Sequence, residues 1–310
     1  MVSMRLRYAA VAGMLMFTAG CGGLTQGVGP AAAPPPLPSA PATRTSPAPA
    51  HTAAPSPTPL AASVLRERPN VPGPWNLVFS DDFDNDQLNS DNWVTCYDWN
   101  YDGCTNGGHP ELEWYLPGQV SVADGALTLS ADKETTPGTN GKTYSWASGM
   151  VSTGRESWDG TPHFTITYGY IAAAIQVPPE QDMFPAFWLM PAGSKTTPPE
   201  IDIYEGTTGP DNAQMTLHWA SPTGRDVHSA VQYGPVDFPD GYHVFAVDWE
   251  PGSITWYIDG IARYRVTDGA HIPKVAMEIL INLAVGWPTP PPADIRSARM
   301  KVDWVRAWQH

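Results

Sequence analysis

The chain has 310 residues, enough for one large domain or two small ones, and it holds 34 prolines and 28 glycines. Only 15% of its residues are charged, a composition that excludes a coiled coil. The 31 acidic and 17 basic residues give a net charge of −14, so we expect no nucleic-acid partner. The 13 tryptophans favour a β-rich fold in which most of them fill the core, with sugar stacking as a second use.

Residues 1–20 have the pattern of a lipoprotein-type signal peptide. Two arginines precede an apolar stretch over residues 8–19, which is shorter than the roughly 20 residues that span a bilayer. Small residues then lead to Cys21, as in a bacterial lipobox, so Cys21 would carry the lipid and become the mature N-terminus. Thr18 departs from the lipobox pattern, and the alternative is an ordinary secretory signal cut near Ala19 or Gly20. Both interpretations predict an extracytoplasmic protein, lipid-anchored to a bacterial cell membrane or otherwise secreted.

A tether is expected to follow over residues 21–70, where Pro, Ala, Ser and Thr dominate and extended conformations are favoured. Residues 1–70 contain five arginines, one glutamate and no tryptophan, a net charge of +4. The remaining residues carry −18 and all 13 tryptophans. The sequence therefore predicts one folded domain over residues 71–310, whose contact with the membrane would be through the lipid anchor only.

Two cysteines remain after Cys21. Cys96 and Cys104 are eight residues apart, and in an oxidising compartment they are expected to form a disulfide that closes a small loop. The alternative is a pair of free thiols. A zinc site is disfavoured because the sequence holds no second pair of cysteines.

Short β-strand patterns recur from Trp75 onwards. Runs such as those over residues 126–130, 168–177, 242–249 and 254–258 alternate or are β-branched, and Gly, Pro, Asn and Asp separate them. Asp259-Gly260 is a hairpin turn signal. No long segment has a period of 3.6 residues. These features predict an all-β sandwich of two antiparallel sheets in a single domain.

The segment Glu200-Ile-Asp-Ile-Tyr-Glu205 has the chemistry of a catalytic strand. Side chains alternate along a strand, so Glu200 and Asp202 share one face, while Glu205 falls out of phase by one residue. A bulge at Ile203–Tyr204 would return Glu205 to the face of the other two acids. The alternative, a solvated acidic face on an edge strand, fits poorly with the flanking prolines, aromatic residues and isoleucines.

Two glutamates on one face suit the hydrolysis of a glycosidic bond with retention. One carboxylate attacks the anomeric carbon while the other protonates the leaving oxygen. A third acid between them, Asp202, would orient the nucleophile and keep the two glutamates at different pKa values.

The sequence resembles glycoside hydrolase family 16, the laminarinase and lichenase family. Glu200–Glu205 is similar to its E-x-D-x-x-E signature in the bulged form, and the likeness extends over nearly all of residues 75–310. Further similar blocks are Phe79–Phe83, Glu111–Tyr115, Tyr257–Gly260, Asn282–Gly286 and Val302–Arg306. The resemblance implies a jelly-roll catalytic domain with a concave substrate cleft and endo-acting hydrolysis of β-glucan. It makes Glu200 the nucleophile, Glu205 the acid/base and Asp202 the assisting acid.

The resemblance also implies roles outside the catalytic strand. Glu111 and Trp188 match cleft-lining positions, and Trp114 is expected to stack on a sugar ring. His218 matches a histidine close to the catalytic strand, with a purely structural role as the alternative. Asp303 matches a position that helps to hold a structural Ca²⁺, and no cofactor is expected for catalysis itself.

Three places depart from the family pattern and are expected to set substrate choice at the cleft rim. His109-Pro110 stands where two asparagines are frequent, and Phe184 replaces a frequent Trp. The loop Trp287–Ala293 is stiffened by prolines, and Trp287 would stack on sugar there unless it packs onto the sandwich away from the cleft.

The leading hypothesis is therefore a monomeric retaining endo-glycosidase of β-1,3 or mixed β-1,3/1,4 glucan, a β-linked polysaccharide, at the cell surface. A transglycosylase that remodels a β-linked polysaccharide is the alternative in chemistry. A carbohydrate-binding jelly roll without catalysis is the alternative in function class, and the intact set of three acids argues against it.

Overall fold

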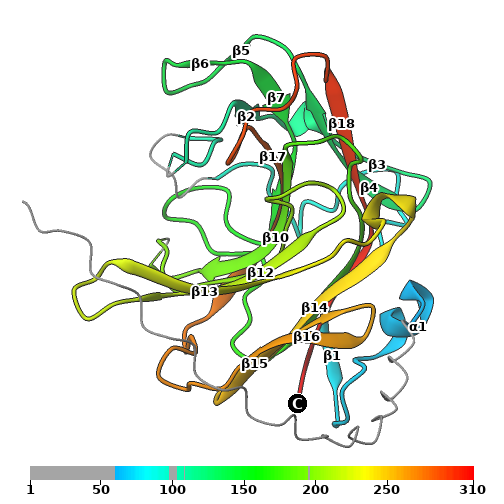
Figure 1. Cartoon of the computed structure of the whole chain (residues 1–310), viewed down its shortest axis with the longest axis vertical. Coiled ribbons are helices and arrows are strands. Elements are labelled where there is room, and N and C mark those ends of the chain that lie inside the picture. Colours follow the sequence, from blue (N-terminus) through cyan, green and yellow to red (C-terminus); the bar gives the residue numbers. More distant parts are fainter. Residues whose placement is uncertain (1–59, 98–102, 108, 195) are drawn as a thin grey trace, which may run out of the picture. The chain divides into compact units, whose positions relative to one another are not determined.

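The computed structural model describes residues 60–97, 103–107, 109–194 and 196–310 (Figure 1). The chain divides into two compact units, Met1–Ala54 and Pro55–His310, and the first lies outside the described residues. The predicted signal peptide, Cys21 and the tether up to residue 59 therefore lie outside them as well. Within the described ranges, the helices are all too short or too polar to cross a membrane.

Two large β-sheets form the described unit (Figure 1). The larger has ten strands, eight of them in the order β16-β15-β14-β9-β18-β4-β7-β2, while β1 pairs with β18 and β3 with β4. Its strands are β1 (Asn76–Asp81), β2 (Glu113–Tyr115), β3 (Val120–Ala123), β4 (Ala126–Asp132), β7 (Trp146–Ser148), β9 (Gly169–Gln176), β14 (His243–Glu250), β15 (Ser253–Ile258), β16 (Ile261–Val266) and β18 (Ser297–Gln309).

The smaller sheet has six strands in the order β13-β12-β11-β10-β17-β8. They are β8 (Met150–Ser152), β10 (Met183–Pro191), β11 (Glu200–Glu205), β12 (Ala213–Ala220), β13 (Asp226–Tyr233) and β17 (Met277–Val285). A separate hairpin pairs β5 (Thr136–Pro137) with β6 (Thr143–Tyr144), and two 3₁₀ turns are η1 (Pro117–Gln119) and η2 (Phe238–Asp240). Among the described pairs only β2 and β7 run parallel, so the predicted all-β fold of two antiparallel sheets is confirmed.

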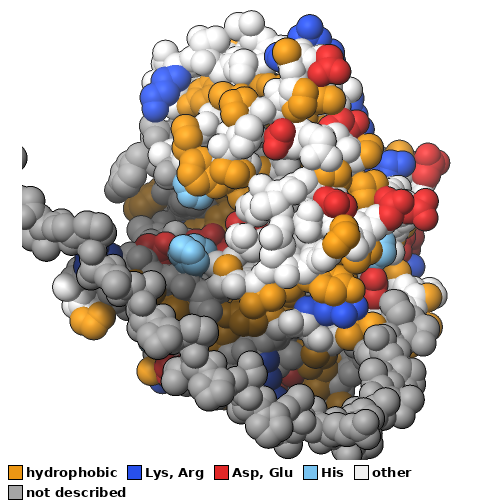
Figure 2. Space-filling model, viewed as in Figure 1, with side chains coloured by type: hydrophobic (Ala, Val, Ile, Leu, Met, Phe, Trp, Pro, Cys, Tyr) orange, Lys and Arg blue, Asp and Glu red, His pale blue; other side chains and the backbone are white. Residues whose placement is uncertain are grey.

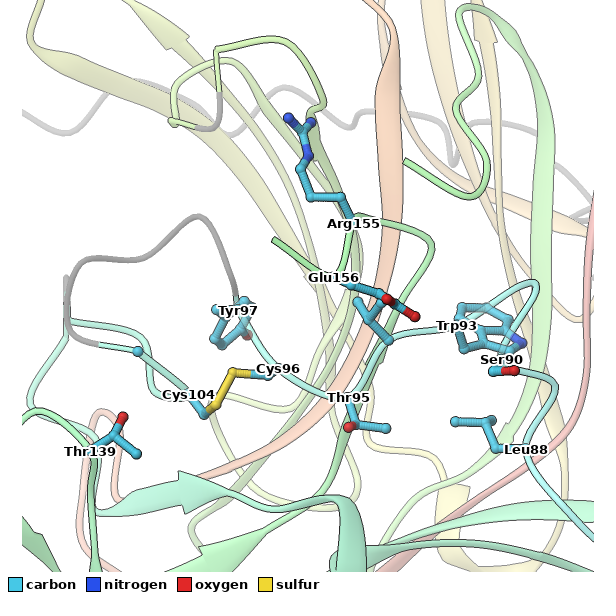
Figure 3. A pocket seen from close by; sticks show the side chains of 12 residues that line it. Leu88, Ser90, Trp93, Thr95, Cys96, Tyr97, Cys104, Thr139, Arg155 and Glu156 are labelled. Carbon is cyan, nitrogen blue, oxygen red and sulfur yellow. A yellow bond between two sulfur atoms is a disulfide. The ribbon is translucent and has the colours of Figure 1, made fainter. Parts of the chain in front are cut away.

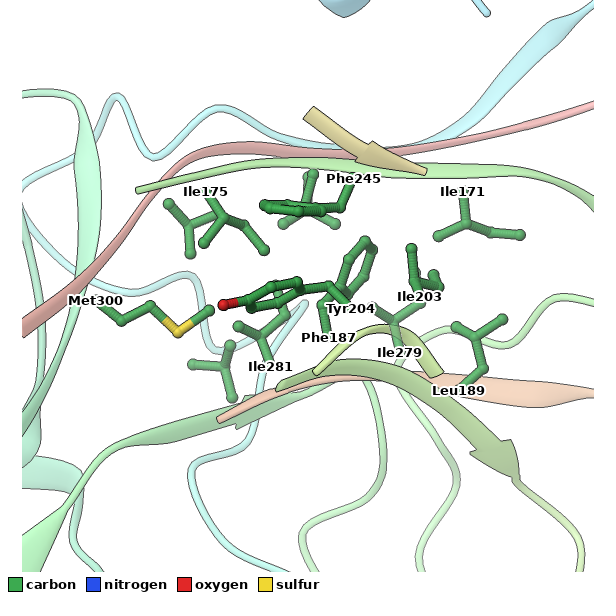
Figure 4. Close-up of a cluster of buried hydrophobic side chains, with 14 of the residues drawn as sticks. Ile171, Ile175, Phe187, Leu189, Ile203, Tyr204, Phe245, Ile279, Ile281 and Met300 are labelled. Atoms are coloured by element: carbon green, nitrogen blue, oxygen red, sulfur yellow. The ribbon is translucent and has the colours of Figure 1, made fainter. Parts of the chain in front are cut away.

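The main core lies between the two sheets (Figure 4). Ile171 and Ile175 of β9 and Phe245 of β14 come from the larger sheet, and they face side chains of β10, β11 and β17. The second face of the smaller sheet is left for the groove described below. The alternation along each strand thus separates one buried face from one that can carry chemistry.

The outer face of the larger sheet is covered by the segment that begins at residue 60. Helix α1 (Ala62–Glu67) places Leu65, which is 2% exposed, against Tyr170, Trp304 and Trp308. Strand β9 is therefore buried on both faces, which explains its nearly uninterrupted apolar sequence. This corrects the predicted tether boundary, because residues 60–70 belong to the folded unit.

The same segment is also fixed by polar contacts. Arg66 donates to Asp82, and Arg306 from β18 donates both to Asp82 and to the carbonyl oxygen of Arg66. Asn70 donates to the carbonyl oxygen of Gly260 at 2.7 Å. Residues 60–70 are therefore fixed by contacts with residues that are distant in the sequence, which their own composition does not indicate.

Candidate active site

Strand β11 contains the predicted bulge. Asp202 pairs with Trp188 of β10, and the next pair joins Tyr204 to Phe187, so Ile203 is the extra residue. Ile203 and Tyr204 both point into the core between the sheets (Figure 4), where they are 1% and 0% exposed. Because two successive residues point inward, Glu205 returns to the face of Glu200 and Asp202.

A tryptophan from the opposite sheet stabilises the bulge. The indole nitrogen of Trp256, in β15, donates a hydrogen bond of 2.8 Å to the carbonyl oxygen of Asp202. This carbonyl lies where the register between β11 and β12 shifts. A buried carbonyl left without a donor would cost about 1–3 kcal/mol, so Trp256 contributes directly to the geometry of the catalytic strand.

A groove crosses the outer face of the smaller sheet and contains the three acids of β11, Glu200, Asp202 and Glu205. Glu111, Phe184, Trp188, His218 and Trp287 all line it beside the acids. Figure 2 shows acidic and histidine side chains close together in a hollow on this side of the molecule. The structure thus brings together five of the six residues predicted to bind substrate.

Glu205 is oriented by two side chains of the neighbouring strand β12. Thr216 Oγ1 and Gln214 Nε2 donate to Glu205 Oε2 at 2.8 and 3.1 Å. Since Oε2 already accepts two hydrogen bonds, a proton carried by this carboxyl group belongs on Oε1. The arrangement suits a group that presents a proton in a fixed direction.

Glu200 and Asp202 form an acidic pair at the centre of the groove. Burial raises the pKa of Glu200 well above its usual value, and the neighbouring charge of Asp202 adds to this. Burial likewise raises the pKa of Asp202, with a further contribution from the charge of Glu205. Burial and like charge therefore disfavour the state in which Glu200 and Asp202 are both ionised.

His218 links this acidic set to the rim of the groove. Its Nε2 lies 3.2 Å from Asp202 Oδ2, and its Nδ1 lies 3.0 Å from Asp226 Oδ2. The ring therefore lies between two carboxylates and is hydrogen-bonded to Asp226. This position beside the catalytic strand agrees with the expected neighbourhood of His218.

Glu111 belongs to a second buried pair of acids. Burial raises the pKa of Glu111 to about 7. Glu113 is 0% exposed, and burial together with the charge of Glu111 raises its pKa well above the usual value. Glu113 Oε2 accepts the backbone N–H of Val285 at 2.9 Å. Glu111 Oε2 and Glu113 Oε1 are buried and have no hydrogen-bond partner within the described residues, an environment that disfavours the state in which both groups are charged.

An aromatic and amide network forms the floor of the groove. Trp188 donates its indole N–H to Asn282 at 2.8 Å, and Asn282 donates to the hydroxyl of Tyr115 at 3.1 Å. Tyr97 packs edge-on against Tyr115, with ring centroids 5.4 Å apart. These contacts fix the Trp188 ring, which is 6% exposed.

Two of the places where the sequence departs from the family pattern, His109 and Trp287, are in contact at the rim of the groove. The rings of His109 and Trp287 stack with an interplanar angle of 2° and a centroid distance of 4.6 Å. Trp287 lines the groove near Glu205, so it does not pack away from the cleft. His109 Nδ1 lies 3.6 Å from Glu111 Oε1. The stack therefore connects the proline-rich loop to the acid pair.

Trp114 occupies a different place from the one expected. It is 2% exposed and packs on Tyr144, with ring centroids 5.3 Å apart. Its ring also lies against Gly103, where a Cβ atom would come within 2.6 Å of it. This corrects the stacking role predicted from the family, because a buried ring presents no face to a sugar.

Several groove residues were missed at the level of sequence. They are Tyr97, Asn106, Thr207, Gln214, Thr216 and Asn282. The alternation Gln214-x-Thr216-x-His218 was a usable signal, since it puts three polar side chains on one face of a strand. Tyr97 and Asn106 lie near the disulfide in irregular segments, for which periodicity gives no signal.

The structure contains the predicted disulfide between Cys96 and Cys104. A cavity of about 570 Å³ lies beside it (Figure 3), lined by Trp93, Arg155 and Glu156 among others. Its described lining offers a single carboxyl group, so it lacks the paired acids that glycosidic chemistry needs. We therefore place the active site in the groove.

The residues around Asp303 do not fit the calcium ion that the family resemblance implies. Burial raises the pKa of Asp303, and the charge of Arg66 opposes this. Burial also raises the pKa of Asp82, but hydrogen bonds from Arg306 and Arg66 outweigh it and hold the pKa below its usual value. Calcium needs six to eight oxygen ligands, whereas this cluster presents two guanidinium groups.

Comparison with known proteins identifies a family for this sequence. The model of "Glycosyl hydrolases family 16" matches residues 111–306. The endo-1,3-1,4-beta-glycanase EglC of Rhizobium meliloti is 36% identical over 252 residues, which cover 74% of this chain and 51% of EglC. A beta-glucanase of Rhodothermus marinus is 28% identical over 76% of this chain and 85% of that protein.

Solved structures agree with the fold. The endo-beta-1,3-glucanase of Pyrococcus furiosus superposes with a TM-score of 0.66 at 27% identity, covering 76% of this chain and 94% of that one. The chain spans about half the length of EglC. The family match covers more than half of the chain and includes the bulged strand with its three acids, and the chain therefore belongs to family 16 of the glycosyl hydrolases.

Proposed function

We propose that this protein is an endo-acting glycosidase that hydrolyses β-glucan with β-1,3 or mixed β-1,3/1,4 linkages and retains the anomeric configuration. The observation that carries the proposal is the bulge in β11, which turns Glu200, Asp202 and Glu205 towards one groove. The names of the relatives, endo-1,3-1,4-beta-glycanase and endo-beta-1,3-glucanase, support the substrate class.

In the first step, Glu200 attacks the anomeric carbon while Glu205 protonates the leaving oxygen. The C–O bond to the leaving sugar breaks, and a bond forms between the anomeric carbon and Glu200. The proton comes from Glu205 Oε1, because Oε2 accepts from Thr216 and Gln214. Asp202 takes over the proton that the acidic pair shares, so that Glu200 is ionised when it attacks.

In the second step, Glu205 acts as the base. It removes a proton from water, the water oxygen attacks the anomeric carbon, and Glu200 leaves as a carboxylate. The chain begins and ends the cycle with the same protons. If a sugar hydroxyl takes the place of water, the same residues perform transglycosylation.

The test is a panel of polysaccharides with the purified chain. We expect reducing ends to appear from laminarin and lichenan, but not from agarose, carrageenan or xyloglucan. Proton NMR taken during the first minutes should show the β-anomer of the product before mutarotation. Product that forms first as the α-anomer would exclude retention, and cleavage of only a galactan would exclude the β-glucan substrate.

We also propose that the protein is lipid-anchored through Cys21 and acts outside the cytoplasm. The support is the sequence pattern of residues 1–21. Mass spectrometry of the native protein should find an acylated Cys21 at the mature N-terminus. An unacylated N-terminus at or beyond Cys21 would leave a secreted protein and exclude the anchor.

A further inference from the structure

Two histidines and an aspartate meet at the rim of the groove, on strands β12 and β13. His218 of β12 pairs across the sheet with His228 of β13, and Asp226 lies two residues before His228 on the same face. One ligand atom from each of the three side chains lies within 4.8 Å of the others. Asp226 and His228 are exposed and His218 is half-buried, so the cluster can be reached from solvent.

We propose that His218, Asp226 and His228 bind a zinc ion that inhibits the enzyme. Two imidazoles and one carboxylate are ligands that zinc prefers, and three protein ligands leave a fourth position for water. A tetrahedral zinc ion holds its ligand atoms about 3.4 Å apart. His218 Nδ1 and Asp226 Oδ2 already lie 3.0 Å apart.

His228 closes the site by a small change of its side chain. The rings of His218 and His228 have centroids 5.2 Å apart, and the His228 side chain is exposed. An exposed side chain can change rotamer at little cost. The site therefore needs no movement of the backbone.

Zinc at this site would lie inside the groove. His218, Asp226 and His228 line the groove together with Glu200 and Glu205. A zinc ion and the water in its fourth position would therefore occupy space beside the two glutamates that a sugar chain must pass through. This inhibitory part rests on the proposed function, whereas the binding of zinc does not.

The first experiment measures zinc binding to the full chain by isothermal titration calorimetry. We expect His228→Gln to weaken binding by roughly tenfold or more, because it removes one of three ligands. The matched control is His310→Gln, which changes an exposed histidine that pairs with Glu250 at the end of β18. Mg²⁺, which prefers oxygen ligands, should not compete. Equal zinc affinity in the wild type and in His228→Gln would overturn the site.

The second experiment measures laminarin hydrolysis with and without zinc, with each variant compared to its own rate in a chelator. We expect zinc to lower the wild-type rate roughly tenfold, and His228→Gln to lose most of this inhibition. Zinc that binds through His228 but leaves the rate unchanged would overturn the inhibition. A chain that cleaves no glucan even without zinc would overturn the proposed function, while the calorimetry would still decide the metal site.

Discussion

At the scale of single residues, Glu200 and Glu205 have different surroundings, although they lie at the two ends of one strand. Glu200 has a pKa raised by burial and by Asp202, whereas Glu205 is oriented by two hydrogen bonds to one of its oxygens. The surroundings of Glu200 favour its protonated form, so it must give up a proton before it can attack. The hydrogen bonds to Glu205 fix the direction in which it delivers a proton. The two glutamates are therefore expected to respond differently to substitution.

We predict that Glu200→Gln abolishes hydrolysis of every substrate, since no carboxylate remains to attack. Glu205→Ala should lower kcat/KM on laminarin by roughly 10²–10⁴-fold. On an aryl β-glycoside with a good leaving group, its first step should be much less affected, because little protonation is needed. Steady-state and burst kinetics on both substrates measure this. Glu156→Gln, at the separate cavity, is the control, and equal loss on both substrates would contradict the role of Glu205 as the acid.

The Glu111–Glu113 pair predicts a pH dependence of stability. The pKa of Glu111 is about 7 in the folded chain, against an ordinary 4.5. Between these values the folded state binds more protons than the unfolded state, so the free energy of unfolding falls as pH rises. One such group lowers the free energy of unfolding by up to about 3 kcal/mol as the pH rises from 4.5 to 7.

The variant Glu113→Gln tests this, because its amide offers Glu111 a permanent N–H donor and no second negative charge. We expect denaturant unfolding of this variant to depend less on pH between 5 and 8 than that of the wild type. The exposed Glu156→Gln should keep the wild-type slope. Parallel curves for wild type and Glu113→Gln would exclude a proton shared within the pair.

At the level of elements, the bulge in β11 depends on contact with the opposite sheet. We predict that Trp256→Phe lowers kcat/KM roughly tenfold or more, because loss of its hydrogen bond lets the Asp202 carbonyl and the adjacent acids shift. Trp304→Phe is the matched control. It removes the same volume from a fully buried site, but within the described residues Trp304 Nε1 meets no acceptor.

Both variants should lower the melting temperature, so activity is compared at a temperature where both remain folded. Circular dichroism and kinetics on the same samples provide the two measurements. Only Trp256→Phe is expected to change the rate. An equal change of rate in the two variants would reduce Trp256 to a packing residue.

Strand β11 and its neighbours show which features of the site can be predicted from the sequence and which cannot. Alternation and the need to bring Glu205 into phase predict the bulge, because both are local properties of one strand. The donors Gln214 and Thr216 follow only once β12 is known to pair with β11. The burial of Trp114 depends on contacts with Gly103 and Tyr144, which no local pattern encodes.

At the level of the whole molecule, the start of the folded unit is decided by long-range packing. Composition places residues 60–70 in the tether, because prolines and small residues surround them. The reason they are folded is the apolar outer face of β9 and β18. Tyr170, Trp304 and Trp308 on this face would be exposed to water if no segment packed on them. Leu65 provides it, and Arg66 joins the same segment to Asp82.

We therefore predict that Leu65→Ala lowers the free energy of unfolding by about 2–4 kcal/mol, the cost of removing a fully buried leucine. The neighbouring Val64→Ala is the control, because Val64 is 54% exposed and should change stability by less than about 0.5 kcal/mol. A truncated chain that begins at residue 71 should be destabilised at least as much as Leu65→Ala, since it also loses Arg66. Urea denaturation of the four proteins measures these differences. If the truncated chain were as stable as the wild type, the folded unit would begin at residue 71 after all, and α1 would add nothing to it.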